Sequence, residues 1–163
     1  EPMRVAALGR AILDGLQRGG VVGVVKHLPG HGRTSVDTHK ALPTVTASDE
    51  DLQLDLAPFR TLNQAPMGMT GHLLFTAWDA QTPSTLSTTV VQDIIRGRIG
   101  FDGLLFTDDL DMEALSGTVP ERARRATIWP ACWPGATTCW QRQHEQRGDR
   151  RGVLFPPGTG GGG

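Results

Sequence analysis

The feature that most restricts the fold of this chain is a cycle of three segments that repeats along the sequence. In each cycle a short apolar run leads into a polar loop, and the next segment carries apolar residues at helical spacing. The expected strands lie at 21–25, within 65–75 and at the start of 101–115, and the expected helices lie at 4–18, 48–62 and 84–100. This order predicts βαβ units with right-handed crossovers, and therefore an α/β fold with a parallel sheet.

Local signals support two of these elements. The run "VVGVV" at 21–25 is short and rich in β-branched residues, which predicts a strand buried on both faces of the sheet. Ser48 precedes three acidic residues and then an amphipathic pattern. We therefore expect Ser48 to cap the helix that follows it.

Polar residues cluster where the predicted strands end. Lys26, His27, His72 and Asp108 all fall at or just beyond such ends. Because the carboxyl ends of parallel strands meet at one edge of the sheet, and chemistry in such folds is found there, this shared placement predicts a functional site.

Composition limits the class of protein. The 163 residues have a formal net charge of −1 and are 38% hydrophobic, as in an ordinary globular domain, and this balance gives no support for a nucleic-acid partner. No apolar run approaches the roughly 20 residues needed to cross a bilayer, and no basic-then-apolar leader is present. Because the chain begins with Glu1, we interpret it as a piece whose true start, with any targeting signal, is missing.

The loop at 26–43 contains a pair of residues that suits proton transfer. Asp37 and His39 are two positions apart, so in an extended loop both side chains can point the same way and form a hydrogen bond. An aspartate on one imidazole nitrogen fixes the tautomer and leaves the other nitrogen for acid–base work. Two alternatives stay open: a loop histidine tied down for rigidity, and a metal site that uses His27, His31 and His39, whose spacing matches no compact zinc signature.

The segment "FTDDLDM" at 106–112 places three carboxylates after an apolar strand. Asp109 and Asp111 suit the start of a helix, whereas Asp108 lies nearest the end of the strand. From spacing alone, Asp108 could be a nucleophile, a metal ligand or a structural residue.

Taken together, three motifs resemble glycoside hydrolase family 3, and within it the bacterial β-N-acetylglucosaminidases of the NagZ type. "KHLPGHGRTSVDTHKALP" resembles the K-H-F-P-G-H-G and D-S-H motifs of that group, "MGMTGHLLFTAWD" resembles its M-T-A-H strand, and "IGFDGLLFTDDLDMEAL" resembles its G-F-D-G-hydrophobic-S-D-D-L-S-M segment. The similarity runs from about residue 4 to 127 in the family's order. The departures are Leu28, Thr38, Gly71, Thr107 and Asp111, where the family has Phe, Ser, Ala, Ser and Ser.

The resemblance implies a retaining two-step glycosidase. Asp108 would be the nucleophile, with Asp109 as the weaker candidate. His39 would be the acid/base, oriented by Asp37, in place of the second carboxyl that retaining enzymes usually employ. Lys26 and His27 match family positions that hydrogen-bond sugar hydroxyls.

The substrate implied is a terminal β-linked N-acetylglucosamine on a cell-wall muropeptide that is being recycled in the cytoplasm. The resemblance implies no metal, no organic cofactor and no nucleic-acid or membrane partner. It also implies that the intact protein is a monomer. No cysteine occurs before residue 128, which agrees with a reducing compartment. Two alternatives to the glycosidase are a metal-dependent barrel hydrolase that uses His27, His31, His39 and Asp108, and a remnant without activity.

Only part of the family fold is expected here. A (β/α)8 barrel of the TIM type needs about 250 residues and eight strands. About three βα units are present, so we expect residues 1–127 to form a partial (β/α)8 barrel domain. Unpaired sheet edges and uncovered apolar faces predict that this polypeptide is poorly stable and inactive alone.

The tail at 128–163 has a different composition. Residues 129–152 contain no Val, Ile, Leu, Met or Phe, yet hold three of the four tryptophans and both cysteines, Cys132 and Cys139. The positions of Trp and Cys follow helical spacing, and the codons of both residues begin with TG. If the reading frame shifts by one base, these two letters end a codon, and codons that end in TG mostly encode Leu, Met or Val. We therefore interpret the tail as an out-of-frame former helix. A disordered extension is the alternative.

Overall fold

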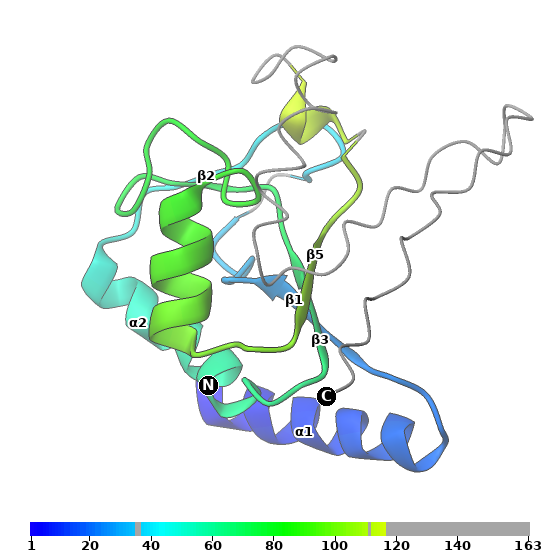
Figure 1. The fold of residues 1–163 in the computed structure, drawn as a ribbon. Coiled ribbons are helices and arrows are strands. Elements are labelled where there is room, and N and C mark those ends of the chain that lie inside the picture. Colours follow the sequence, from blue (N-terminus) through cyan, green and yellow to red (C-terminus); the bar gives the residue numbers. More distant parts are fainter. Residues whose placement is uncertain (35–36, 111, 117–163) are drawn as a thin grey trace, which may run out of the picture.

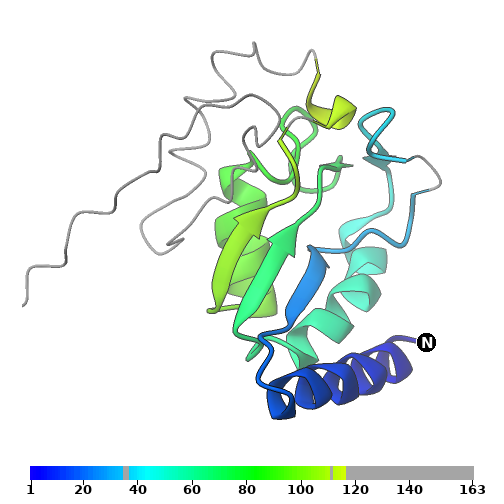
Figure 2. The same cartoon turned by 90° about the vertical axis from the view of Figure 1, so that its right-hand side faces the viewer.

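The structure is a computed structural model that describes residues 1–34, 37–110 and 112–116. Its centre is a parallel sheet of three strands, β1 (Val24–Leu28), β3 (Met67–Thr70) and β5 (Leu104–Thr107), in the spatial order β1-β3-β5. Figure 1 shows these strands beside one another, and in Figure 2 their arrowheads point to the same edge of the sheet. The strand–helix alternation predicted from the sequence is confirmed, and so is the α/β fold class.

Two helices connect the strands and cover one face of the sheet. α2 (Asp49–Thr61) joins β1 to β3, and η1 (Thr89–Ile99), which has the wider winding of a π-helix, joins β3 to β5. α1 (Pro2–Arg18) precedes β1 and packs against α2. Two short parallel strands, β2 (Thr44–Val45) and β4 (Leu74–Phe75), pair beyond the main sheet, and the 3-10 turn η2 (Glu113–Leu115) follows β5.

The start of α2 confirms the cap predicted from the sequence, and η1 ends at the glycine that closes its expected range. Ser48 is the N-cap of α2, and its hydroxyl accepts a hydrogen bond from the backbone N–H of Asp51 at 3.2 Å. Gly100 ends η1 in the left-handed conformation, with φ of 71°, which costs glycine little because it has no Cβ. The helix expected at 84–100 begins later, at Thr89, because Ser84 and Ser87 bond to neighbouring loop groups.

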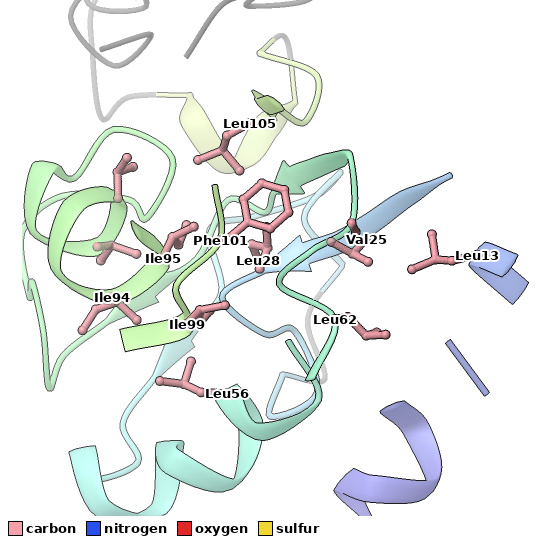
Figure 3. Packing of buried hydrophobic residues seen from close by; sticks show 13 residues of the cluster. Leu13, Val25, Leu28, Leu56, Leu62, Ile94, Ile95, Ile99, Phe101 and Leu105 are labelled. Carbon is pink, nitrogen blue, oxygen red and sulfur yellow. The ribbon is translucent and has the colours of Figure 1, made fainter. Parts of the chain in front are cut away.

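The main hydrophobic core lies between the sheet and its helices. Figure 3 shows Phe101 among Leu28, Leu105 and Ile95, and all four side chains are almost fully buried. Gly68 in β3 makes room for this ring, because a Cβ there would lie 2.7 Å from Leu28 Cδ1 and 2.8 Å from Phe101 Cζ. The core therefore depends on close backbone approach as well as on apolar side chains.

The prediction of a first strand at 21–25 buried on both faces is wrong in two respects. The strand begins at Val24 and runs through Lys26 and His27 to Leu28. Val21 and Val22 are 52% and 59% exposed. The physical reason is that, within the described residues, helices cover only one face of the sheet and β1 lies at its edge.

No helix in the described part of the chain is long and apolar enough to cross a membrane. The tail predicted at 128–163, with Cys132 and Cys139, lies outside the described residues, and so does Asp111.

Candidate active site

The carboxyl edge of the sheet brings together residues from different βα units. Asp108 directly follows β5, and His27 lies near the end of β1 on the other side of β3. Parallel register places Lys26 opposite Met69, and Met69 opposite Phe106, so the three strands end at the same level. The sequence prediction that these strand ends share one edge is confirmed.

Both oxygens of the Asp108 carboxylate have partners. Oδ2 lies 3.3 Å from His27 Nε2, and Oδ1 accepts a hydrogen bond from the backbone N–H of Asp109 at 2.9 Å. The hydrogen bond from His27 is the main cause that lowers the pKa of Asp108 to about 2, and partial burial works in the opposite direction. Asp108 is therefore ionised at any pH near neutrality, as a carboxylate nucleophile must be.

Asp37 and His39 form the pair that their spacing predicts. His39 Nδ1 lies 2.8 Å from Asp37 Oδ1, and the backbone N–H of His39 donates to the same oxygen at 2.9 Å. This backbone bond, followed by the one from the ring, lowers the pKa of Asp37. His39 Nε2 is not bonded to Asp37. The side chains of His39 and Asp37 are 75% and 53% exposed, so a ligand can reach them.

The two remaining predicted residues lie on the open side of β1. Lys26 is exposed and His27 is half-buried, and both line a groove of about 720 Å³ that continues along α1 and α2. His31 lines the same groove, with its ring centroid 5.6 Å from that of His27. The peptide bonds Lys26–His27 and Leu28–Pro29 are cis.

The four residues of the metal hypothesis do not form a common site. His27 contacts Asp108, His31 Nδ1 lies 3.1 Å from Thr34 Oγ1, and His39 contacts Asp37. Within the described ranges no group of three or more histidines, cysteines or acidic residues is arranged to hold a metal ion. The geometry therefore gives separate pairs, which suit proton transfer and charge stabilisation better than metal ligation.

A buried polar cluster behind Asp108 was not predicted. His72, which the sequence places at a strand end without a role, is fully buried and lies 2.8 Å from both Thr85 Oγ1 and the carbonyl oxygen of Asp109. Ser84 and Thr70 complete this cluster. The only sequence signal was the polar run at 84–87 ahead of an apolar helix, and spacing alone does not reveal its partners.

The fold and this edge of the sheet define the class of protein. Residues 1–127 match the model of the glycosyl hydrolase family 3 N terminal domain, and the chain belongs to that family. The architecture is accordingly that of a partial (β/α) barrel, with three successive strands and their helices.

Individual relatives narrow the comparison. The chain is 43% identical to a protein from Chromobacterium violaceum named β-hexosaminidase over 134 residues, which are 77% of this chain and 36% of that protein. Among solved structures it is similar to a family 3 β-N-acetylglucosaminidase from a Paenibacillus species, with 41% identity, a TM-score of 0.71 and coverage of 77% of this chain and 25% of the other. NagZ from Neisseria gonorrhoeae, solved with N-trifluoroacetyl-D-glucosamine, is 36% identical with a TM-score of 0.69, and the match covers 80% and 38%.

The extent of these matches matters for function. The chain spans a little over a third of the length of the curated relatives it matches. The site residues named above come from this third alone, so their roles are predictions.

Proposed function

We propose that the protein to which this chain contributes is a retaining glycosidase that releases terminal β-linked N-acetylglucosamine. The observation that carries the proposal is that an ionised aspartate, Asp108, follows β5 and an Asp37–His39 pair follows β1, the two outer strands of the described sheet in a family 3 domain. The names of the relatives from Chromobacterium and Paenibacillus support the choice of sugar.

In the first step the Asp108 carboxylate attacks the anomeric carbon and forms a glycosyl ester, while the bond from that carbon to the leaving oxygen breaks. His39 gives the proton of Nε2 to that oxygen. In the second step His39 takes a proton from water, the water oxygen attacks the same carbon, and Asp108 leaves as a carboxylate. Asp37 holds His39 Nδ1 in both steps and stabilises the protonated ring.

Lys26 and His27 are assigned to substrate binding. Both line the groove at the end of β1, where their N–H groups can donate to sugar hydroxyls. His27 has a second effect, because its bond to Asp108 keeps that carboxylate charged. More specifically, we propose that the substrates are muropeptides in the cytoplasm. The intact protein would act as a monomer and without a metal.

We further propose that this polypeptide alone is inactive and poorly stable. Large apolar side chains of α1 and of the segment before β1 are exposed in the described structure, and β1 is an edge strand. Burial of such surfaces normally supplies much of the stability of a barrel, at about 25 cal/mol for each Å² removed from water.

The test compares this chain with a fused protein, in which the N-terminal barrel segment of the Chromobacterium relative precedes the chain. Both are incubated with an aryl β-N-acetylglucosaminide, in the presence and absence of chelator. Release of the aryl group by the fused protein only, unaffected by chelator and lost on Asp108→Ala, supports both proposals. A folded fused protein that releases nothing would sink the glycosidase assignment, and dependence on metal would favour a metal hydrolase.

A further inference from the structure

His72 is a buried histidine that the proposed mechanism does not use. It is 0% exposed, and its two ring nitrogens lie 2.8 Å from Thr85 Oγ1 and 2.8 Å from the carbonyl oxygen of Asp109. A carbonyl oxygen only accepts, so Nε2 carries the proton and donates it to Asp109. Burial lowers the pKa of His72, and the ring is therefore neutral with Nδ1 as an acceptor.

The surrounding hydroxyls are consistent with this tautomer. Thr85 Oγ1 lies 2.8 Å from both His72 Nδ1 and the carbonyl oxygen of Gly71. The Thr85 hydroxyl can donate to either of them. Because the Gly71 carbonyl also accepts from the Ser84 hydroxyl at 2.7 Å, it keeps a donor when Thr85 turns its single proton to His72 Nδ1. Thr70 can then donate to Thr85, across 3.1 Å. Every polar group of this buried cluster thereby has a partner, which holds the imidazole in one orientation.

The backbone of Asp109 links His72 to the candidate nucleophile. Its carbonyl accepts from His72, and its N–H donates to Asp108 Oδ1 at 2.9 Å. These two groups belong to the successive peptide units on either side of the Asp109 Cα, so a displacement of this residue would disturb both bonds. The position of Asp108 Oδ1 therefore depends on a side chain that lies on a different βα unit.

A second path leads from Asp109 to the acid/base pair. The N–H of Met112 donates to the same Asp109 carbonyl at 3.3 Å, and the N–H of Leu115 donates to Met112 at 3.0 Å. From the same turn, the N–H of Ala114 donates to the carbonyl oxygen of Thr38 at 3.1 Å. We refer to the segment of Asp109, Met112 and Ala114 as the connecting turn.

Thr38 lies between Asp37 and His39, and its environment differs from theirs. Thr38 is 8% exposed, whereas the side chains of its two neighbours are more than half exposed. The bond from Ala114, which is fully buried, thus attaches the loop of the acid/base pair to the connecting turn.

We propose that His72 is a positioning residue that, through the connecting turn, places both the nucleophile Asp108 and the acid/base His39. This inference rests on the proposed glycosidase function. His72 is fully buried and does not touch substrate, so its loss should change kcat more than KM. Since a misplacement of about 1 Å can cost about a hundredfold in rate, a loosened turn is sufficient for a large effect.

The test uses His72→Phe, which keeps a ring but removes the donor, and His72→Gln, which offers an amide N–H in its place. Thr85→Val is the matched control, because it removes a buried polar partner of the same imidazole but leaves the Nε2 bond to Asp109 intact. Each variant is made in the fused protein and assayed with aryl β-N-acetylglucosaminides whose leaving phenols range from strongly to weakly acidic.

General-acid catalysis matters most for poor leaving groups, so displacement of His39 steepens the dependence of kcat on the leaving group. For His72→Phe we expect a loss of about thirtyfold with the poorest leaving group and about threefold with the best, and partial recovery in His72→Gln. Thr85→Val should fall by a smaller factor that is similar on all substrates, because it loosens the imidazole but leaves the Nε2 bond to Asp109. An equal loss by His72→Phe on every leaving group would overturn the proposal, because a merely structural defect lowers the active fraction uniformly.

A second measurement does not depend on activity. The backbone N–H of Ala114 should exchange with solvent faster in His72→Phe than in the unsubstituted fused protein, since its bond to Thr38 depends on the anchored turn. Unchanged exchange would overturn the proposed link. If the unsubstituted fused protein hydrolyses no substrate, the glycosidase function fails, and the exchange rate of Ala114 still decides whether His72 holds the connecting turn.

Discussion

Two regions that meet at β1 differ in how their groups are partnered. At the carboxyl edge, the polar groups of Asp108, His72 and the Asp37–His39 pair lie in hydrogen bonds that come from three βα units. On the outer side, the apolar residues Val5, Leu8, Ile12 and Leu16 follow one face of α1 and are all exposed. Figure 2 shows α1 at the end of the sheet opposite the carboxyl edge.

The contrast shows that local chemistry and global stability have different sources. The site is assembled by contacts within the described chain, and it does not require α1. The stripe on α1 has the helical spacing of a buried face, yet within the described residues only Ala6 and Leu13 of this helix are buried. The proposed site residues can therefore hold one another in place in a domain whose core is only partly covered.

The largest effect is expected at the site. In the fused protein, Asp108→Ala should lower kcat by about ten-thousandfold or more, because it removes the proposed nucleophile, whereas the loss of its bond to His27 should lower stability by only about 1–2 kcal/mol. The matched control is Asp102→Ala, an exposed aspartate near the start of β5. Activity and thermal unfolding are measured together, and a variant of Asp108 that kept more than about a tenth of the rate would exclude it as the nucleophile.

The next effect separates the two regions by burial. Leu56 is fully buried and Ile12 is 63% exposed. In the isolated chain, Leu56→Ala should reduce the free energy of unfolding by about 2–5 kcal/mol, and Ile12→Ala by less than about 0.5 kcal/mol. In the fused protein the cost of Ile12→Ala should rise to about 2 kcal/mol or more, because the added segment covers α1.

Urea denaturation of both proteins measures these differences. If Ile12→Ala stayed neutral in the fused protein, the added segment would not pack on α1. The exposure of the apolar stripe on α1 would then need an explanation other than a missing part of the core.

A smaller effect concerns pH and belongs to the site alone. The pKa of Asp108 is about 2 when folded and near 3.8 when unfolded, so the unfolded state binds more protons between these values. The charged carboxylate thus stabilises the fold above about pH 4, by about 1–2 kcal/mol, and this contribution is lost as pH falls through about 2. Denaturation of the unsubstituted protein and of Asp108→Asn between about pH 2 and 5 should show a steeper acid loss in the former. Parallel curves would mean that His27 does not hold the charge of Asp108.

The smallest effect tests a feature that both regions share, the regular βα unit. Ser48→Ala removes the side-chain cap of α2 and should cost about 1 kcal/mol, whereas Ser48→Asp should cost much less because aspartate also caps. Activity per folded molecule of the fused protein should not change. A selective loss of activity in Ser48→Ala would show that α2 positions the site more directly than its contacts indicate.

Much of the fold could be predicted because it follows from local patterns. The cap at Ser48, the turn at Gly100 and the alternation of strand and helix all depend on residues close in sequence. The start of β1 could not be predicted, because the run "VVGVV" is equally compatible with a strand and with the extended segment that leads into one. Only pairing with β3 decides that Val24 is the first residue of the strand.

The candidate site was predictable in part for the same reason. The Asp37–His39 bond is local, and its two-residue spacing indicates it. The contact between His27 and Asp108 joins distant segments and needed the parallel sheet as an intermediate step. The bonds from His72 to Asp109 and from Ala114 to Thr38 use backbone groups, which every residue has, so no side-chain pattern in the sequence reveals them.

The order of the site residues along the chain has a consequence for inheritance. Lys26, His27, the Asp37–His39 pair and Asp108 all lie within one uninterrupted stretch of sequence, and the proposed positioning residue His72 lies inside it as well. One recombination event on each side of this stretch would transfer all of these proposed site residues together to another barrel. Other segments that contribute to sugar preference could then change independently. New substrate specificities can therefore arise while the chemical reaction stays the same.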